Sequence, residues 1–454
     1  MELKRSFFQS CWMKILDASN EGSASIATYR IQATRVITQA IRRARAGAAA
    51  AFRFVAVRKN RRKPAHAASR PTPAWNPEAM ESKTRSDGVD LMRGIAILLV
   101  LILHFHLTYR LNVTPIDSPF LSDAIKAVAR NGNYGVTMFF AASGFLITST
   151  SIRRFGSLGA IEPATFYAYR ASRILPSLAL VLVAIVALGS LGLRSFVDKP
   201  DTASTFVAVL SVLTFWHNVL MAKVGYFNYA MNILWSLSVE EVFYLAFPIL
   251  CLVLRRRRRI VAFLCVPIVA GPLYRSLHAQ DEIVALYGYV SCFDAIAMGC
   301  CAALLPFRPL PRGWSRALRT AAAAAIAAVY LSGPIMRNVV WGVTAVAFCS
   351  AVLLYGCRDD ARDDARAPRV ASRVIRWFGQ RSYELYLFHI VVLGILREVV
   401  TRETIGAGAK PMWLVFYVSV SALVAQCVFR FYSEPLNDAL RRGAARFSPG
   451  YPQK

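Results

Sequence analysis

Acidic residues are scarce in this 454-residue chain. Only 26 Asp and Glu stand against 54 Lys and Arg, so the formal net charge is +28. In a soluble protein such a charge would suggest nucleic-acid binding. Here the arginines cluster at the ends of apolar runs, where loops beside an anionic membrane leaflet carry them. We therefore expect no nucleic-acid partner.

The cysteines lack the spacings of common cysteine sites. The nine cysteines form no CxxC pair, and most of them lie in apolar segments. Cys300 and Cys301 are adjacent, which suits neither an ordinary disulfide nor a metal site. We expect the cysteines to be small buried hydrophobic side chains, and we predict no metal site.

Long apolar runs dominate what is present. Hydrophobic residues make up 56% of the chain and the mean hydropathy is +0.41, which is too apolar for a soluble enzyme of this length. Ten runs are each close to the ~20 residues that a helix needs to cross ~30 Å of hydrocarbon. We therefore predict an all-α, polytopic integral membrane protein with about ten transmembrane helices. The predicted spans are 91–109, 133–150, 174–194, 231–254, 260–275, 283–305, 318–335, 339–356, 383–400 and 411–431.

The loop charges predict how these helices are oriented. Basic residues gather in 153–173, 255–259, 308–319 and 358–381, and at both ends of the chain. With ten spans all of these segments face the cytoplasm, as the positive-inside rule requires, so both termini are predicted to be cytoplasmic. An eleventh apolar run, 204–221, would move the five arginines at 255–259 outside if it crossed the membrane. We predict an interfacial or re-entrant helix there.

The two ends of the chain differ from the membrane part. Residues 1–86 are rich in Ala and Arg, and no apolar segment of a signal peptide follows the basic part. We expect a flexible basic tail, with a start codon assigned too early as the alternative. Residues 36–57 could form a surface-lying amphipathic helix. Residues 443–454 are predicted to be a short tail, which leaves 87–442 as the membrane domain.

Arg93 and His104 are ionisable residues of the first apolar run. Eleven residues advance ~16 Å along a helix, and eleven steps of ~100° return to within ~20° of the starting direction. Both side chains are therefore predicted to share one helix face, with Arg93 at the cytoplasmic edge and His104 about halfway across. Ionisable groups at this depth are costly and usually functional, although a histidine satisfied by one helix partner is the alternative. His106 points to another face and is the better candidate for a structural histidine.

Glu240 and Glu241 are adjacent carboxylates in a later apolar run. Glu240 lies ~22 Å from the cytoplasmic end of that helix, beyond the midplane. Adjacent residues diverge by ~100°, so at most one carboxylate faces any one partner. A buried acid needs partners whatever its role, so a packing carboxylate bonded to Trp235, Ser236 or Tyr244 is the alternative to a functional one.

Polar residues also mark two other helices. His389 is predicted to lie ~12 Å into the span that follows Arg381, and a structural role is as plausible there as a catalytic one. Arg170 and Arg173 are three residues apart and adjacent on one helix face. Such a pair could chelate the phosphates of an anionic ligand, although ordinary positive-inside charge is the alternative.

Six motifs in one order resemble the acyltransferase-3 superfamily, integral-membrane O-acyltransferases that modify bacterial surface glycans. The resemblance covers about residues 87–442. The motifs are DLMRGIAILLVLILHF (90–105), GVTMFFAASGFLIT (135–148), FYAYRASRILP (166–176), LWSLSVEEVFYLAFP (234–248), FDAIAMGCCAALL (293–305) and SYELYLFHIVVL (382–393).

The family's signatures can be placed on this chain residue by residue. They fall on Arg93 and His104, on Ser143, Gly144 and Phe145, on Arg170 and Arg173, and on Glu240 and Glu241. The chain departs from the pattern at Thr137, where relatives often carry an acidic residue, which puts the usual hydrogen-bond network there in doubt. It also departs in its long N-terminal segment and in having no fused hydrolase-like domain.

The resemblance implies an enzyme of the bacterial inner membrane. It would move an acyl group, most often acetyl, from cytoplasmic acyl-CoA to a hydroxyl of an exported carbohydrate such as O-antigen or exopolysaccharide, with no bound cofactor. Acylation of a small molecule such as a macrolide is an alternative. A secondary transporter also uses buried His and Glu, but its inverted repeats are not found in this sequence.

The resemblance also assigns roles to the residues. His104 would act as general base or as transient acyl carrier, with Arg93 and Glu240 as the other catalytic residues; a near-neutral imidazole suits either role of His104. The donor phosphates would lie against two arginines. The predicted substrate-binding residues are Arg170, Arg173, Ser143, Glu241, His389 and Trp235.

Overall fold

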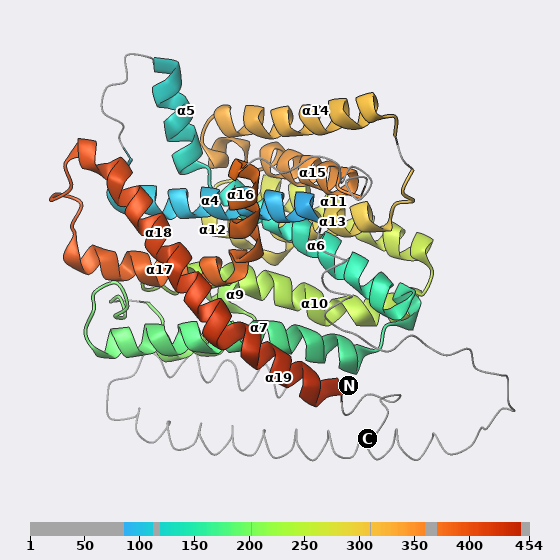
Figure 1. Cartoon of the computed structure of the whole chain (residues 1–454), viewed down its shortest axis with the longest axis horizontal. Helices are drawn as coiled ribbons and strands as arrows, with labels where there is room; N and C mark the ends of the chain where they lie inside the picture. Colours follow the sequence, from blue (N-terminus) through green and yellow to red (C-terminus); the bar gives the residue numbers. More distant parts are fainter. Residues whose placement is uncertain (1–85, 112–118, 201, 309, 359–369, 446–454) are drawn as a thin grey trace, which may run out of the picture. The chain divides into compact units, whose positions relative to one another are not determined.

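The computed structural model describes residues 86–111, 119–200, 202–308, 310–358 and 370–445. Helices form all the regular secondary structure in these ranges (Figure 1). The predicted basic tail, its amphipathic-helix candidate and the last residues of the chain lie outside the described part. The α-helices are α4 (Asp87–Tyr109), α5 (Pro119–Arg130), α6 (Asn133–Phe155), α7 (Pro163–Ser190), α8 (Thr205–Leu213), α9 (His217–Val224), α10 (Trp235–Leu254), α11 (Arg257–Leu277), α12 (Glu282–Tyr287), α13 (Tyr289–Leu304), α14 (Arg312–Leu331), α15 (Trp341–Gly356), α16 (Val370–Gln380), α17 (Ser382–Val399), α18 (Lys410–Val428) and α19 (Glu434–Ala445).

The predicted all-α, polytopic membrane architecture is confirmed. Each of the ten predicted spans coincides with a helix, or with two successive helices, of the structure. Three predicted spans correspond to helices that are shorter or less apolar than the spanning helices named next. They are 318–335 (α14), 339–356 (α15) and 383–400 (α17). Seven helical segments of the described residues are long and apolar enough to cross a membrane: Asp87–Tyr109, Asn133–Phe155, Pro163–Ser190, Asn232–Leu254, Arg257–Leu277, Glu282–Leu304 and Lys410–Arg442. Which end of the bundle faces the cytoplasm stays a prediction.

The ambiguous run 204–221 forms two short helices rather than one span. The chain breaks between α8 and α9, where Phe215 has a positive φ of 62°. His217 at the start of α9 is buried between the Ser211 hydroxyl, 2.7 Å from its Nδ1, and the Met231 carbonyl, 3.0 Å from its Nε2. Burial lowers the pKa of His217 to about 4, so this histidine is neutral at physiological pH. It is a satisfied structural histidine.

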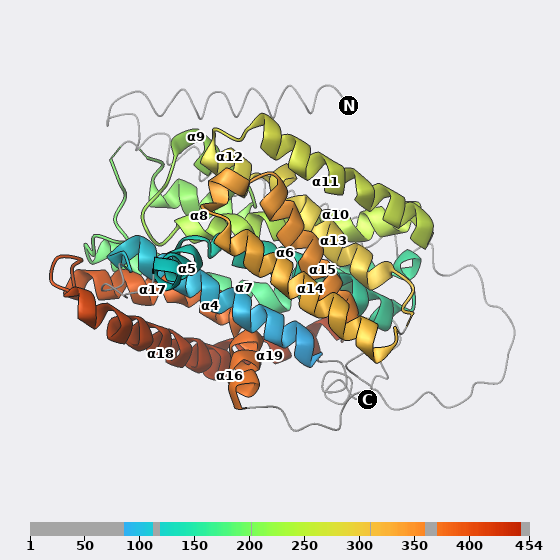
Figure 2. The same ribbon diagram turned by 90° about the horizontal axis from the view of Figure 1, so that it is seen from above.

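Glycines allow a close helix crossing between α6 and α13. A Cβ atom on Gly144 would strike the backbone carbonyl of Ile296, and one on Gly299 would strike that of Ala141. Small residues let membrane helices approach until their backbones touch. Figure 2 shows α6 and α13 running through the middle of the bundle. The Gly144 of the family motif therefore has a packing role.

The surface and interior of the bundle have the polarity that a bilayer demands. Large aliphatic side chains such as Val183, Val253, Val266 and Leu423 are more than half exposed on the outer helices. Charged side chains such as Arg275 and Asp294 are instead fully buried between helices. A helix in lipid places apolar groups outward and keeps polar groups against protein partners. The candidate site is among these interior polar groups.

Candidate functional site at the contact of α4 and α17

Arg93 and His104 both turn toward α17. The Arg93 Nη2 donates a hydrogen bond of 2.7 Å to the Ser382 hydroxyl, at the first residue of α17. Eleven residues further along α4, the ring of His104 lies 5.0 Å from that of His389, in a T-shaped arrangement. The prediction that Arg93 and His104 share one helix face is confirmed. The order of the two contacts also makes α4 and α17 parallel.

The same local bond orients both histidine rings. The Nδ1 of His104 lies 2.9 Å from the Val100 carbonyl oxygen, and the Nδ1 of His389 lies 2.9 Å from that of Leu385. A carbonyl oxygen only accepts hydrogen bonds, so each Nδ1 carries the proton and each neutral ring keeps its lone pair on Nε2. The helix backbone therefore sets the tautomer of His104.

His389 is buried without a full set of partners. Its side chain has no exposed surface, and its Nε2 has no hydrogen-bond partner among the described residues. Tyr386 stands beside it, with ring centroids 5.9 Å apart, and the Tyr386 hydroxyl lies 2.6 Å from the Ser236 hydroxyl of α10. A buried lone pair without a hydrogen-bond donor costs free energy of folding. Such an unsatisfied group is typical of a residue that is kept for a function.

A second polar cluster lies between α6, α7 and α10. The Tyr244 hydroxyl donates to the Glu240 carboxylate over 3.0 Å and also contacts the Ser143 hydroxyl of the family motif. Of the partners expected for a packing carboxylate, Tyr244 is the one that Glu240 uses. Arg93 and Arg170 both interact electrostatically with Glu240, so charges from α4 and α7 converge on it.

Arg170 is directed into this cluster. Its guanidinium carbon lies 3.6 Å from the centre of the Tyr244 ring, and its Nη2 lies 3.9 Å from the Glu241 carboxylate. Arg173 is exposed instead. The two arginines of the RxxR motif thus have different surroundings, one partly neutralised by Glu241 and one at the surface. Their predicted role in binding phosphate stays a prediction.

Glu384 connects the two clusters. This carboxylate at the start of α17 is buried, and it interacts electrostatically with Arg173, Arg381 and Arg93. Arg93 thus donates to Ser382 and interacts electrostatically with both the Glu240 and the Glu384 carboxylates. Its hydrogen bond to the first residue of α17 ties α4 to α17 at this end.

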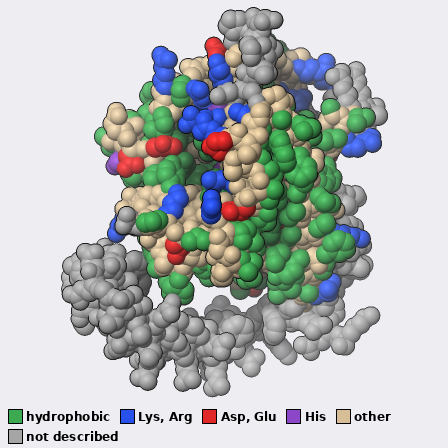
Figure 3. Space-filling model, turned by 90° about the vertical axis from the view of Figure 1, so that its left-hand side faces the viewer, with side chains coloured by type: hydrophobic (Ala, Val, Ile, Leu, Met, Phe, Trp, Pro, Cys, Tyr) green, Lys and Arg blue, Asp and Glu red, His purple; other side chains and the backbone are tan. Residues whose placement is uncertain are grey.

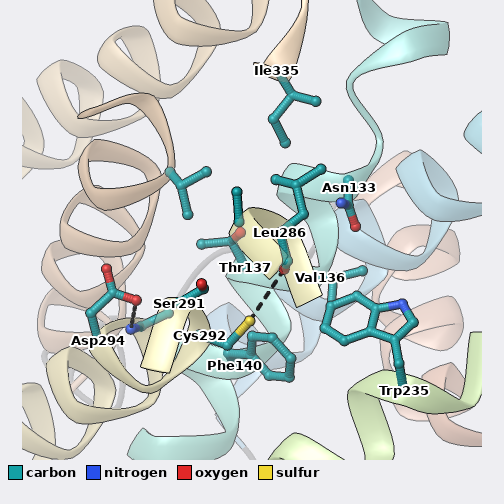
Figure 4. A pocket seen from close by; sticks show the side chains of 13 residues that line it. Asn133, Val136, Thr137, Phe140, Trp235, Leu286, Ser291, Cys292, Asp294 and Ile335 are labelled. Atoms are coloured by element: carbon teal, nitrogen blue, oxygen red, sulfur yellow. Dashed lines mark hydrogen bonds between the residues drawn. The ribbon is translucent and has the colours of Figure 1, made fainter. Parts of the chain in front are cut away.

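Trp235 lines a small pocket at the end of the bundle where α6 and α10 begin (Figure 4). Its ring packs edge-on against Phe140, with centroids 5.9 Å apart. Thr137, Ser291 and Asp294 add polar groups to the wall. An acidic residue from α13 thus lies in the same pocket as Thr137, the position where relatives often carry an acid.

The Asp294 carboxylate of this pocket is held by a buried arginine. The Arg275 Nη2 lies 2.5 Å from the Asp294 carboxylate and 2.6 Å from the Thr344 hydroxyl, and its Nη1 donates to the Ser291 carbonyl. Both charged side chains are fully buried. Such a pair joins α11, α13 and α15, so Asp294 is committed to structure.

Sequence reasoning did not single out several of these residues. Tyr244 appeared only as one possible partner of a packing acid, and Tyr386, Ser382 and Arg275 were not selected. Tyr244 lies one helical turn after Glu240, a spacing that could have marked it. The contacts of Tyr386 and Arg275 cross between helices, and a single sequence carries no signal for such pairs.

A family described as an acyltransferase domain matches residues 86–430. The chain belongs to this family. A Staphylococcus aureus (strain COL) protein provisionally named as an O-acetyltransferase is 24% identical over 77% of this chain and 56% of its own length. A Bacillus subtilis (strain 168) protein provisionally named as a peptidoglycan O-acetyltransferase is 24% identical over 77% of this chain and 54% of its own length.

A third acyltransferase relative is matched over more of its own length. A Komagataeibacter xylinus protein provisionally named as a membrane-bound transacylase is 27% identical over 80% of this chain and 88% of its own length. The chain spans about half the length of the first two acyltransferases. No solved structure matches the chain.

Proposed function

We propose that this acyltransferase-family protein moves an acetyl group from cytoplasmic acetyl-CoA to a hydroxyl of an exported carbohydrate, in the bacterial inner membrane. The observation that carries the proposal is the His104–His389 pair, in which the helix backbone leaves the Nε2 lone pair of His104 unprotonated. The relatives named for O-acetyl transfer and for transacylation support the reaction class. The same family match favours acyl transfer over transport.

His104 acts as the general base in this proposal. Its Nε2 accepts the proton of the acceptor hydroxyl while that oxygen forms a bond to the thioester carbonyl carbon. The carbon–sulfur bond then breaks, and the proton passes from the imidazolium to the leaving CoA thiolate. A neutral imidazole has both the basicity and the reversibility that the two proton transfers require.

The polar cluster around Arg93 is the region where the acyl-CoA donor binds in this proposal. Arg93 lies ~16 Å along α4 from His104, so a donor held near the Arg93 end can extend its thioester toward the histidine. Arg170, held between Tyr244 and Glu241, and the exposed Arg173 line the same predicted cytoplasmic side. Arginine side chains suit the phosphates of coenzyme A.

The His104→Ala variant tests the proposal. We expect it to abolish acetylation of a surface glycan, measured by mass spectrometry of glycan from a knockout strain complemented with the variant, while the protein remains in the membrane. His278→Ala is the matched control, because His278 lies at the end of α11, away from both sites, and its ring contacts its neighbour Tyr274. Full acetylation by His104→Ala would refute the role. An acetyl label retained on His104 would identify a carrier in place of a base.

A further inference from the structure

Basic side chains gather at the end of α4 that lies opposite Arg93. Arg110, Arg130 and Lys410 all interact electrostatically with His106, one from each of three segments of the chain. Figure 3 looks onto this end of the bundle and shows Lys and Arg side chains near its middle, with Asp and Glu side chains beside them. The positive-inside rule predicts few cations here, because this end is the predicted extracytoplasmic one. Their presence therefore needs a reason.

Lys410 is a buried cation that forms no ion pair with any side chain in the described part of the chain. Its side chain is at the first residue of α18, and the residue is only 9% exposed. The ammonium group donates 2.9 Å to the backbone carbonyl of Arg110, and none of the ion pairs between described residues includes it. A carbonyl dipole does not neutralise a buried charge, so an anion is the expected complement.

The neighbours of Lys410 strengthen the demand for an anion. Arg110 and Arg130 are exposed, and no ion pair among the described residues includes either of them. Arg110 has a positive φ of 47°, which turns the chain at the end of α4 and places its carbonyl against Lys410. The Nδ1 of His106 accepts the Leu111 N–H, so its Nε2 is the protonated nitrogen in the neutral ring. The described side chains of Arg110, Arg130 and Lys410 are thus all hydrogen-bond donors.

We propose that Arg110, Arg130 and Lys410 bind a phosphate group carried by the acceptor, such as the diphosphate that joins a sugar to a lipid. Three positive charges are matched better by a phosphate group than by the single negative charge of a carboxylate. The planar guanidinium group of arginine also fits the oxygens of a phosphate. Arg110 lies ~9 Å along α4 beyond His104, so a sugar attached to the bound phosphate can present its hydroxyl to the histidine. The inference rests on the proposed acyl transfer, because that reaction needs an acceptor.

Binding of inorganic pyrophosphate to the full chain tests the site without relying on activity. In phosphatidylcholine nanodiscs, calorimetry should show binding to the unaltered protein. It should be about tenfold or more weaker for Arg110→Asn combined with Arg130→Gln, since each lost charged hydrogen bond costs about tenfold. Asparagine tolerates the positive φ, and both positions are exposed, so the variant should fold.

The matched control removes two exposed cations elsewhere on the same predicted face. Arg194→Gln combined with Lys223→Gln changes the net charge by the same amount and should leave pyrophosphate binding unchanged. No binding by the unaltered protein, or an equal loss in both double variants, would overturn the site. If phosphatidylglycerol in the nanodiscs abolishes pyrophosphate binding, a lipid headgroup fills the cluster and the assignment to the acceptor is overturned.

Two acceptor substrates then test the anion site and the proposed acyl transfer independently of each other. One carries N-acetylglucosamine on a prenyl diphosphate, and the other is the octyl glycoside of the same sugar. The Arg110→Asn, Arg130→Gln variant should raise the KM for the diphosphate acceptor about tenfold or more and leave that for the glycoside unchanged. Equal effects on both acceptors would refute the inference. Acetylation of neither acceptor, with pyrophosphate binding intact, would refute the proposed reaction and not the anion site.

Discussion

Removal of the single hydroxyl oxygen of Tyr244 should be enough to disable the cluster around Glu240. Tyr244→Phe keeps the ring on which Arg170 stacks at 3.6 Å and removes only the oxygen. That oxygen donates to Glu240 over 3.0 Å and contacts Ser143. The change therefore removes a hydrogen-bond donor from the half-buried Glu240 carboxylate and a partner from the half-buried Ser143 hydroxyl.

The expected loss can be worked from these contacts. A hydrogen bond to a charged group contributes about 1.5–3 kcal/mol, and a partner left unsatisfied in a buried site adds to the cost. That range corresponds to about tenfold to a hundredfold in an equilibrium or rate constant. We expect Tyr244→Phe to lower kcat/KM for acetyl transfer by about this factor and to lower the thermal midpoint of the detergent-solubilised protein.

Transfer of radiolabelled acetyl from acetyl-CoA to an acceptor glycan provides the assay, and unfolding of the purified protein provides the stability readout. Tyr167→Phe is the matched control. Its hydroxyl donates over 2.7 Å from α7 to the Leu245 carbonyl of α10, at an exposed position. Unchanged kcat/KM and thermal midpoint for Tyr244→Phe would show that the cluster does not depend on this oxygen.

Two further predictions concern packing. Gly299→Ala should cost about 1–3 kcal/mol in unfolding free energy, because its Cβ would meet the Ala141 backbone; Gly313→Ala, whose Cβ meets open space, should have little effect in the same thermal assay. Arg275→Met should cost about 3–5 kcal/mol because it leaves Asp294 buried without its partner, and Arg275→Met with Asp294→Leu should recover most of the loss; a double variant as unstable as the single one would contradict this reasoning.

The helices of the bundle could be predicted well from the sequence, because each helix that crosses a bilayer is a long apolar run of residues. Apolar runs of the length of the hydrocarbon core can only be helices, since lipid offers no partner for backbone groups. That 204–221 does not form one span was also predicted, although on the charge of a distant loop; the break at Phe215 was not. The two short helices themselves needed the structure.

Parts of the candidate site were predicted where the information lies within one helix. The shared face of Arg93 and His104 follows from helical geometry alone, and the Tyr244 partner of Glu240 is one turn away on the same helix. The motif order identified the family. The different surroundings of Arg170 and Arg173 were not predicted, because their helix spacing is the same whichever neighbour they meet.

The sequence by itself determined that this is an all-α membrane protein of an acyltransferase family, since hydropathy and motif order are properties of the chain. Only the tertiary structure decided that His104 meets His389, that Arg170 meets Glu241, and that Lys410 is buried with two further cations beside it. These partners are separated by tens to hundreds of residues. Packing between helices brings them together, and that packing depends on the side chains of all the helices at once.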